Sequence, residues 1–507
     1  MRFNYVCIAT VILFGFNSLV QSKDLLITSD FGSITKCKNT NEIRKVADVM
    51  YSARPDIVAV DAANPDACNY TTQKGYTYLN DNLKKLAAEG NEPYDVIINA
   101  LKDKGVTAVS NIRMNDHHGS QAYWTPWQRE HIEWSLSKDT GERTWAAIGA
   151  LKQMDYAVKE VREYRLAIIG EILEKFNVDG LQLDFARTSP FLSEPKMENA
   201  EYLTEYIVET RALLDRFAKR RNTKMLLGVI VPWDMTFCKK EGLDVERWIK
   251  EGLVDYVCPS EWHYSDWNMP IEKWSDIVEG TDCKLYPMYL GEVAPWRAGK
   301  WLFQRGQTPL LENNAKLNGP LIRSLAQNAY SQDADGMMFY NFYTFVYGSY
   351  YPLLRDWTDP VKSKEQYRRY FYCRRQSYTP TEYDSFKTGS AFDHWMLNKK
   401  GDKVEYQFYF GEEVGDSVSL FRFKIQDSFV GDKFEVVLNN EKVRLLDKER
   451  FDHVNSEGKK YNVVIWKALV NSEQLKKGLN QVVVTLSKKD SKREASLGVD
   501  EFEILVN

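Results

Sequence analysis

Two short segments place a carboxylate beside polar or aromatic side chains in patterns that could support catalysis. Residues 178–187 read VDGLQLDFAR and contain Asp184, and residues 259–264 read PSEWHY and contain Glu261. Two carboxyl groups facing each other across a cleft can cleave a glycosidic bond, because one protonates the leaving oxygen while the other attacks or stabilises the anomeric carbon. We therefore predict Asp184 and Glu261 as a catalytic pair.

Both assignments have alternatives in the sequence. Asp184 could instead be a structural carboxylate that pairs with Arg187 or with a neighbouring strand. Glu292 and Asp234 are the alternative candidates for the acid, because both are carboxylates close to the ends of predicted strands.

A third polar run, Asn115-Asp116-His117-His118, closely follows Arg113. His and Asp together can bind a divalent metal, which makes a metal-dependent hydrolase or deacetylase an alternative function. Adjacent His side chains on an extended loop point in different directions, however, and no HxH or HExxH spacing supplies a second set of ligands. We therefore predict hydrogen bonds to hydroxyl or anionic substituents, and neither a metal nor another cofactor. Arg113 would contact a carboxylate or sulfate, or orient Asp184.

Aromatic residues are abundant, at 13% of the chain with 14 Trp and 29 Tyr. Flat rings beside hydrogen-bonding groups suit a sugar, because its C–H faces stack on aromatic rings while its hydroxyls need donors and acceptors. Trp124 and Trp127 are expected to line subsites. The predicted substrate-binding set is Arg113, Asn115, Asp116, His117, His118, Arg187, Trp233, Asp234, Trp262, His263, Tyr289, Glu292, Trp296, Tyr340 and Asn341.

The elements that must position these residues alternate between short apolar strands and amphipathic helices as far as residue 345, which predicts a parallel sheet. Strong helical periodicity covers 161–176 and 200–220. Eight strands fit a (β/α)8 barrel, since no Gly-rich phosphate fingerprint follows the first strand as in a doubly wound sheet. The predicted strands are 25–28, 57–60, 107–111, 180–183, 226–231, 256–259, 284–288 and 336–340.

Catalytic groups of such a barrel come from the carboxyl ends of its strands, because that face is open. Asp184, Glu261, Tyr340 and most of the predicted binding residues follow strands in this way. The first two strands end at Asp30 and Asp61, to which the sequence alone assigns no role.

The pattern changes after the barrel, which we place at residues 23–360. Residues 361–380 form a basic, Tyr-rich connector, and residues 381–507 alternate as in an antiparallel β-sandwich. Such a domain could bind sugar, but packing against the barrel is the favoured interpretation. Its predicted strands are 404–410, 417–423, 433–437, 462–466 and 481–486, with a turn at Asn439-Asn440.

The N-terminus predicts export. Arg2 precedes an apolar run over 6–16 that is too short to span a membrane, and small residues at Val20 and Ser22 predict cleavage of a signal peptide over 1–22. The protein is therefore expected to be secreted or periplasmic. Cys37 and Cys68 could pair in such a compartment.

The overall charge excludes one class of partner. The chain has 67 basic and 71 acidic residues, a net charge of -4, which indicates no nucleic-acid partner. No later segment qualifies as a membrane span. A carbohydrate substrate is the predicted partner, and the oligomeric state is left open.

The run 178–187, between its two flanking helices, resembles the signature of the family-ten-like glycosyl hydrolases, a group of secreted (β/α)8 barrels. Residues 252–257 (GLVDYV) and 334–340 (ADGMMFY) resemble the sixth and eighth strands of that family. The resemblance covers residues 24–345 and does not name the sugar. By analogy with retaining barrels, it implies Asp184 as the nucleophile and Glu261 as the acid/base.

Together these patterns predict a secreted glycoside hydrolase that acts on a polysaccharide or a derived oligosaccharide by a retaining mechanism. The alternative from a different class is a carbohydrate-binding barrel that has lost catalysis, and both candidate carboxylates argue against it.

Overall fold

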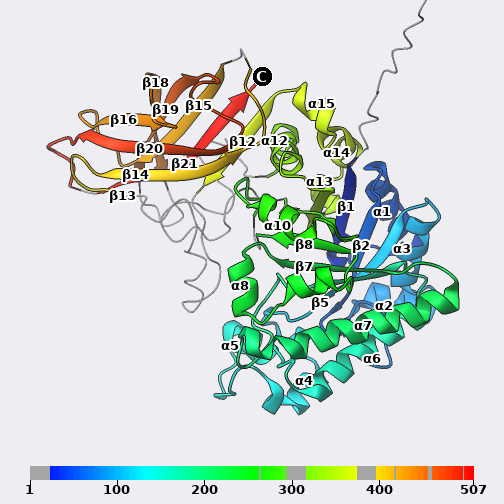
Figure 1. Ribbon diagram of the computed structural model, residues 1–507. Helices are drawn as coiled ribbons and strands as arrows, with labels where there is room; N and C mark the ends of the chain where they lie inside the picture. Colours follow the sequence, from blue (N-terminus) through cyan, green and yellow to red (C-terminus); the bar gives the residue numbers. More distant parts are fainter. Residues whose placement is uncertain are drawn as a thin grey trace, which may run out of the picture.

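The computed structural model describes residues 23–261, 264–291, 293, 316–373, 396–415, 418–454, 460–494 and 496–507. The described chain forms a parallel barrel, blue to yellow-green in Figure 1, and an antiparallel sandwich, yellow to red. The predicted signal peptide, residues 1–22, lies outside the described residues. So do four predicted site residues, Trp262, His263, Glu292 and Trp296.

Eight parallel strand positions close into the barrel in sequence order, with β1 paired to both β2 and β11. All eight predicted strands are confirmed, and with them the (β/α)8 fold. The strands are β1 (Asp24–Ser29), β2 (Ile57–Asn64), β5 (Thr107–Arg113), β6 (Gly180–Asp184), β7 (Leu226–Pro232), β8 (Tyr256–Ser260), β9 and β10 together (Lys284–Leu285 and Met288–Leu290) and β11 (Gly336–Tyr340). Short β3 (Ala67–Cys68) and β4 (Tyr76–Thr77) extend the sheet beyond β2.

A polar layer crosses the interior of the barrel below the carboxyl ends of the strands. Gln182 donates to Thr28 Oγ1 at 3.0 Å and to Asn111 Oδ1 at 2.8 Å, and it accepts from the Tyr256 hydroxyl at 3.2 Å. Gly228 makes room for the Tyr256 ring, because a Cβ at this glycine would lie 2.0 Å from it. The layer closes the barrel to water and gives the residues above it a rigid base.

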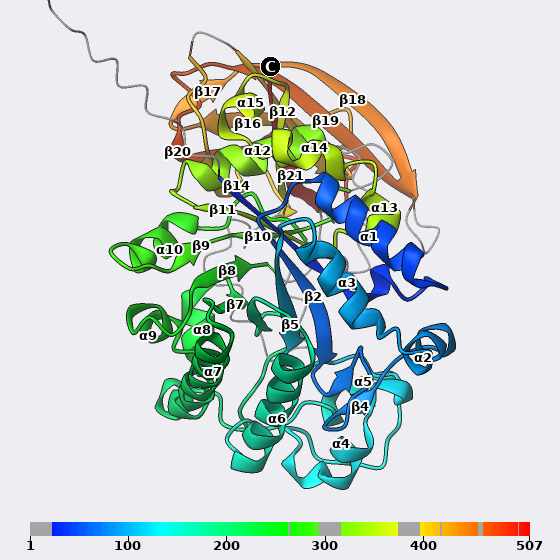
Figure 2. The same ribbon diagram turned by 90° about the vertical axis from the view of Figure 1, so that its right-hand side faces the viewer.

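Helices surround the barrel, as Figure 2 shows. The two predicted helices are confirmed as α6 and α7, which begin and end within two residues of the expected positions. The helices are α1 (Thr40–Ser52), α2 (Asp81–Ala88), α3 (Pro93–Lys102), α4 (Pro126–Glu130), α5 (Trp145–Leu151), α6 (Lys159–Lys175), α7 (Ala200–Arg221), α8 (Met235–Lys240), α9 (Val245–Lys250), α10 (Ile271–Val278), α12 (Gly319–Tyr330), α13 (Thr344–Tyr347), α14 (Tyr351–Trp357) and α15 (Pro360–Lys364).

The C-terminal part consists of two antiparallel sheets, as predicted. Asn439 and Asn440 have φ values of 50° and 70° and form the expected tight turn between β16 and β17. One sheet has the order β12-β21-β15-β19-β18 with β13 on β21, and the other β14-β20-β16-β17. The strands are β12 (Arg368–Cys373), β13 (Met396–Leu397), β14 (Lys403–Phe410), β15 (Ser419–Gln426), β16 (Lys433–Leu438), β17 (Glu441–Val443), β18 (Leu445–Val454), β19 (Lys460–Val470), β20 (Gly478–Lys488) and β21 (Leu497–Val506).

Two further features bear on the sequence predictions. The cysteines of the described part are all free thiols, so Cys37 and Cys68 do not form the disulfide that the sequence allowed. Among the described helices, none is both long and apolar enough to cross a membrane.

The sandwich packs directly on α12 of the barrel. Arg323 donates through Nε and Nη2 to the Tyr367 carbonyl at 2.9 and 2.8 Å, and Ser324 Oγ donates to the Arg369 carbonyl at 2.6 Å. Asn268 exchanges hydrogen bonds with the backbone of β14 at 2.9 and 3.0 Å. Since α12 is buried along almost its whole length, the barrel uses the sandwich as part of its outer layer.

Removing residues 381–507 should therefore leave a barrel that aggregates or melts at a much lower temperature than the full chain. The cut deprives β12 of its partner β21 and exposes apolar side chains that contact the removed strands, including Tyr372, whose ring stacks on that of Phe502 with centroids 4.8 Å apart. Thermal melting and size-exclusion chromatography of the two chains measure the effect. A monodisperse truncated barrel with a melting temperature close to that of the full chain would show that the two parts fold independently.

Candidate active site

Arg113 occupies the centre of a charged cluster at the carboxyl ends of the barrel strands. Its Nη2 lies 2.8 Å from Asp30 Oδ2 and 3.1 Å from Asp61 Oδ2, and its Nη1 lies 3.3 Å from Asp116 Oδ2. Its Nε donates to the Tyr340 hydroxyl at 3.2 Å. These partners come from the ends of β1 and β11, from within β2 and from the loop after β5, so one buried guanidinium joins four segments of the active-site face.

Asp184 ends β6 beside this cluster. Its Oδ1 accepts hydrogen bonds from the backbone N–H groups of Ala186 and Arg187, both at 3.1 Å, which fixes the carboxylate against its own loop. Burial raises the pKa of Asp184, although the charges of Arg113 and Arg187 and a hydrogen bond with Tyr340 act in the opposite direction. The structure thus places Asp184 and its predicted neighbours Arg113, Arg187 and Tyr340 together.

Asp30 and Asp61 are the residues whose importance the sequence did not reveal. Burial and the negative charges of Asp30 and Asp184 raise the pKa of Asp61 to about 7 against the opposing charge of Arg113. For Asp30, burial is outweighed by Arg113 and by the Gly32 N–H, so its pKa is lowered. Their positions at strand ends were the only available signal, because the ion pairs with Arg113 connect residues on different strands.

The stability of the wild-type protein should fall from about pH 4 to pH 7. We expect this fall to be much smaller in the Asp61→Asn variant. An unfolded aspartate titrates near ~3.9, whereas Asp61 in the folded protein keeps its proton up to a pKa of about 7. The folded state therefore binds more protons in this window, and stability falls as pH rises. Melting temperatures across the window measure the slope.

Asp116→Asn is the matched control for this experiment. Burial opposes ionisation of Asp116, but the hydrogen bond from His118 and the charges of Lys152 and Arg113 hold its pKa well below the ordinary value. Its stabilising contribution is present throughout the window and is lost only at lower pH. The control should lower stability evenly and keep the wild-type slope. An unchanged slope in Asp61→Asn would show that Asp61 does not bind this proton.

Asp116 orients His118 as well as Arg113. Its Oδ1 accepts from the His118 backbone N–H at 2.7 Å and lies 2.6 Å from His118 Nδ1, and Lys152 Nζ is 3.7 Å away. With Nδ1 donating to Asp116, the other ring nitrogen of His118 lies 3.5 Å from Arg187 Nη2. The His118 side chain is 42% exposed, so its free edge faces the open side of the site.

The other members of this run point elsewhere. Nδ1 of His117 lies 3.3 Å from Gln153 Oε1, and burial lowers the pKa of this histidine. Asn115 donates to the carbonyls of Met154 and Pro190 at 3.3 and 2.9 Å, which uses both hydrogens of its amide. In the described part of the chain, no three His, Cys, Asp or Glu side chains are grouped so that they could hold a metal ion.

Glu261 directly follows β8 and is largely buried. Its Oε2 accepts a hydrogen bond from Trp233 Nε1 at 2.7 Å, which connects the predicted acid to a predicted binding residue at the end of β7. Asp234 caps α8 through the N–H of Thr236 at 2.8 Å. This hydrogen bond makes Asp234 a helix cap as well as a candidate acid.

The remaining predicted binding residues lie at varying depth. Tyr289 is fully buried in the barrel core, whereas Asn341 follows β11 with a left-handed φ of 53°. Trp124 is buried between Arg129 and Arg143, and Trp127 stacks on Tyr164 with ring centroids 3.8 Å apart. Both tryptophans therefore pack within the loop region after β5.

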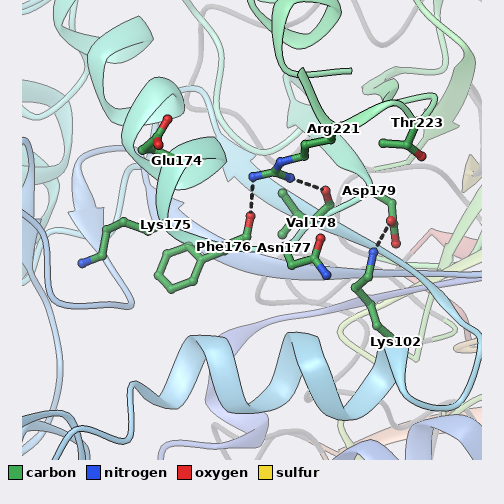
Figure 3. A pocket seen from close by; sticks show the side chains of 9 residues that line it. All are labelled: Lys102, Glu174, Lys175, Phe176, Asn177, Val178, Asp179, Arg221 and Thr223. Atoms are coloured by element: carbon green, nitrogen blue, oxygen red, sulfur yellow. Dashed lines mark hydrogen bonds and ion pairs between the residues drawn. The ribbon is translucent and has the colours of Figure 1, made fainter. Parts of the chain in front are cut away.

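A surface cavity at the opposite end of the barrel is lined by residues that make structural contacts. Its wall includes Phe176, Val178 and Asp179, just before β6 begins. Figure 3 shows Arg221 donating to the carbonyls of Phe176 and Val178, at 2.9 and 3.1 Å, and Lys102 paired with Asp179. These contacts fix the end of α6 and the loop that leads into β6, a stabilising role typical of the amino-terminal face of such barrels.

No protein-family model matches the chain, and no curated protein matches it. Membership of the family-ten-like glycosyl hydrolases is therefore not shown. Three similar solved structures are described as a glycoside hydrolase domain, an alpha-amylase and an alpha-galactosidase. The glycoside hydrolase domain of PgaB (BpsB) from Bordetella bronchiseptica is 12% identical over 66% of this chain and 99% of that chain, with a TM-score of 0.45.

The maltogenic alpha-amylase AmyB from Thermotoga neapolitana is 11% identical over 91% of this chain and 99% of its own, with a TM-score of 0.37. The alpha-galactosidase AgaB from Geobacillus stearothermophilus is 10% identical over 96% of this chain, with a TM-score of 0.37. The chain spans only 55% of that enzyme. At these identities and TM-scores, the similarities do not assign an activity to this chain.

Proposed function

We propose that the protein is a glycoside hydrolase that cleaves glycosidic bonds in a polysaccharide or a derived oligosaccharide with retention of configuration. The observation that carries the proposal is the placement of two buried carboxylates, Asp184 and Glu261, directly at the carboxyl ends of β6 and β8. Barrel enzymes build their active sites on this face, and a carboxylate pair is the machinery of glycoside hydrolysis.

Asp184 acts as the nucleophile in this proposal. One carboxylate oxygen attacks the anomeric carbon while the bond to the leaving oxygen breaks, which forms a covalent glycosyl-enzyme. Arg113 and Arg187 favour the ionised carboxylate against the effect of burial. The positive charge that develops on the sugar in the transition state favours the ionised form further.

Glu261 acts as the acid and then as the base. It gives its proton to the leaving oxygen in the first step. In the second step it takes a proton from water, whose oxygen attacks the anomeric carbon and releases Asp184. The hydrogen bond from Trp233 holds the Glu261 carboxyl group in one orientation throughout.

A panel of neutral and anionic polysaccharides tests the function directly. The wild-type protein should release oligosaccharides from at least one of them, and nuclear magnetic resonance of the first product should show the anomeric configuration of the substrate. The activity should survive treatment with a chelator. An inverted product would contradict the retaining mechanism, and loss of activity on chelation would favour the metal-dependent alternative.

Glu261→Gln should lose activity on natural linkages but retain the first step on a substrate with an activated leaving group. Such a leaving group needs little protonation, so a glycosyl-enzyme on Asp184 should accumulate, and azide should restore turnover by replacing the water that needs a base. Steady-state rates on both substrate types, with and without azide, measure the effect.

Asp244→Asn is the control, because asparagine also caps helices and should preserve the start of α9. Turnover of this variant should remain close to that of the wild-type protein. Equal losses of Glu261→Gln on both substrate types without azide rescue would instead show that Glu261 only positions its neighbours.

A further inference from the structure

A pair of stacked aromatic rings lies between the end of β11 and the first turn of α13. Phe345 is 57% exposed, more than any other large hydrophobic side chain in the described barrel. Its ring stacks on that of Tyr343, with centroids 5.2 Å apart and an angle of 27° between the planes. Lys36 Nζ lies 4.8 Å from the Phe345 centroid. We refer to Tyr343, Phe345 and Lys36 as the aromatic shelf.

The shelf adjoins the Arg113 cluster. A Cβ placed on Gly32 would lie 3.6 Å from the Tyr343 ring, and the Gly32 N–H donates to Asp30 Oδ1 at 2.8 Å. Burial and the charge of Asp30 raise the pKa of Tyr343, while Arg113 opposes them, as expected for a ring beside these groups. Asp30 is 24% exposed, whereas Arg113 is almost fully buried, so Asp30 forms the edge of the cluster nearest to solvent.

The order of the strands explains why the two loops meet. β1 and β11 are adjacent, with Thr28 opposite Tyr340, so the loops that follow them open on the same face of the barrel. The left-handed backbone of Asn341 ends β11, and α13 begins directly after Tyr343. Figure 2 shows α13 beside α1, the helix that follows the β1 loop. Tyr343 and Phe345 are thus fixed at the start of α13, and Lys36 lies in the turn that leads to α1.

The exposed ring of Phe345, backed by the ring of Tyr343, presents a flat apolar surface to solvent. The C–H face of a pyranose ring suits such a surface, while an ammonium group beside it can donate hydrogen bonds to the oxygens of the same sugar. The shelf adjoins Asp30, the solvent-facing edge of the Arg113 cluster beside which Asp184 lies.

Resting on the function proposed above, we propose that the aromatic shelf is an outer subsite that binds one sugar ring of the substrate beyond the cleaved bond. The shelf therefore determines specificity for chain length. Phe345 supplies the stacking surface, Tyr343 fixes its orientation, and Lys36 binds oxygen substituents of that ring.

A ladder of oligosaccharides with two to six sugars, prepared from the polysaccharide that the wild-type protein cleaves, tests the proposal. Phe345→Ala should raise KM for the longest members about tenfold, as expected for the loss of one stacking contact. The kcat and KM for the shortest cleaved member should be unchanged. Phe345→Trp should restore long-chain binding, and Lys36→Gln should weaken it to a smaller extent.

Phe429→Ala is the matched control, since Phe429 is a 41% exposed phenylalanine on the sandwich and should not affect any member of the ladder. Unchanged KM values for all lengths in Phe345→Ala would overturn the subsite and leave the proposed function standing. Equal losses on short and long members would overturn it in favour of a structural role for Phe345. A wild-type protein that cleaves no polysaccharide would overturn both proposals.

Discussion

Asp184→Asn should lower kcat by at least about 10³-fold on every cleaved substrate while binding of the glycan stays nearly intact. The amide keeps the shape of the carboxylate and can still accept from the N–H groups of Ala186 and Arg187. It cannot attack the anomeric carbon or stabilise the positive charge there. Assays of product release measure the effect on kcat, and calorimetric titration with an oligosaccharide measures the effect on binding.

The same strand supplies a matched control. Asp179 lies just before β6, at the opposite end of the barrel, where its carboxylate accepts from the Ala108 N–H at 2.9 Å and pairs with Lys102. Asp179→Asn should lower stability modestly and leave kcat unchanged. If Asp184→Asn turned over substrate at a near-normal rate, Asp184 would be excluded from the mechanism.

The barrel strands could be predicted because their burial leaves a simple signal. Every residue of β2, β6, β8 and β11 is buried, so these strands are mostly apolar runs with turn residues on either side. The strands β14, β16 and β20 were equally clear, because one face is buried and the other exposed, which gives strict alternation.

The strand β21 escaped prediction because it buries charges. Glu501 and Glu503 are fully buried, the first paired with Lys424 at 3.2 Å and the second with Arg422 at 2.8 Å. Buried acidic residues break the apolar pattern of a strand, and their partners lie on β15, some 80 positions earlier. Only the sheet pairing brings these opposite charges together.

Prediction of the candidate site was limited in the same way, because contacts between distant strands cannot be read from the sequence. Strand ends could be read from the sequence, and they correctly brought Asp184, Arg113 and Tyr340 to one face. The sequence could not show that Asp30, Asp61 and Asp116 converge on a single arginine. That geometry depends on the closure of β1 against β2 and on the loop after β5.

Among the single substitutions proposed for this protein, replacing Arg113 should have the largest effect on stability. The guanidinium is the shared partner of Asp30, Asp61 and Asp116, and its charge opposes the rise in the pKa of Asp184 that burial causes. Arg113→Met keeps the apolar stem but leaves these buried carboxylates facing one another without a cation. Removal of one partner from a buried ion pair costs roughly 3–5 kcal/mol, and a shared partner should reach at least the upper part of that range.

The pH dependence of the variant separates this electrostatic effect from a packing defect. Without Arg113, the pKa values of the buried carboxylates rise, so the folded state takes up protons that the unfolded state lacks above about pH 4. Stability therefore falls as pH rises, and Arg113→Met should be much closer to the wild-type protein at pH 5 than at pH 7. Urea unfolding at the two pH values measures the difference. If the variant does not fold at neutral pH, the soluble yield at each pH is compared instead.

Arg113→Lys is the control variant. It retains the charge without the forked geometry, so its stability should lie between those of the wild-type protein and Arg113→Met. A deficit of Arg113→Met that is equal at both pH values would show that the arginine stabilises the barrel by packing rather than by balancing the charge of its carboxylates.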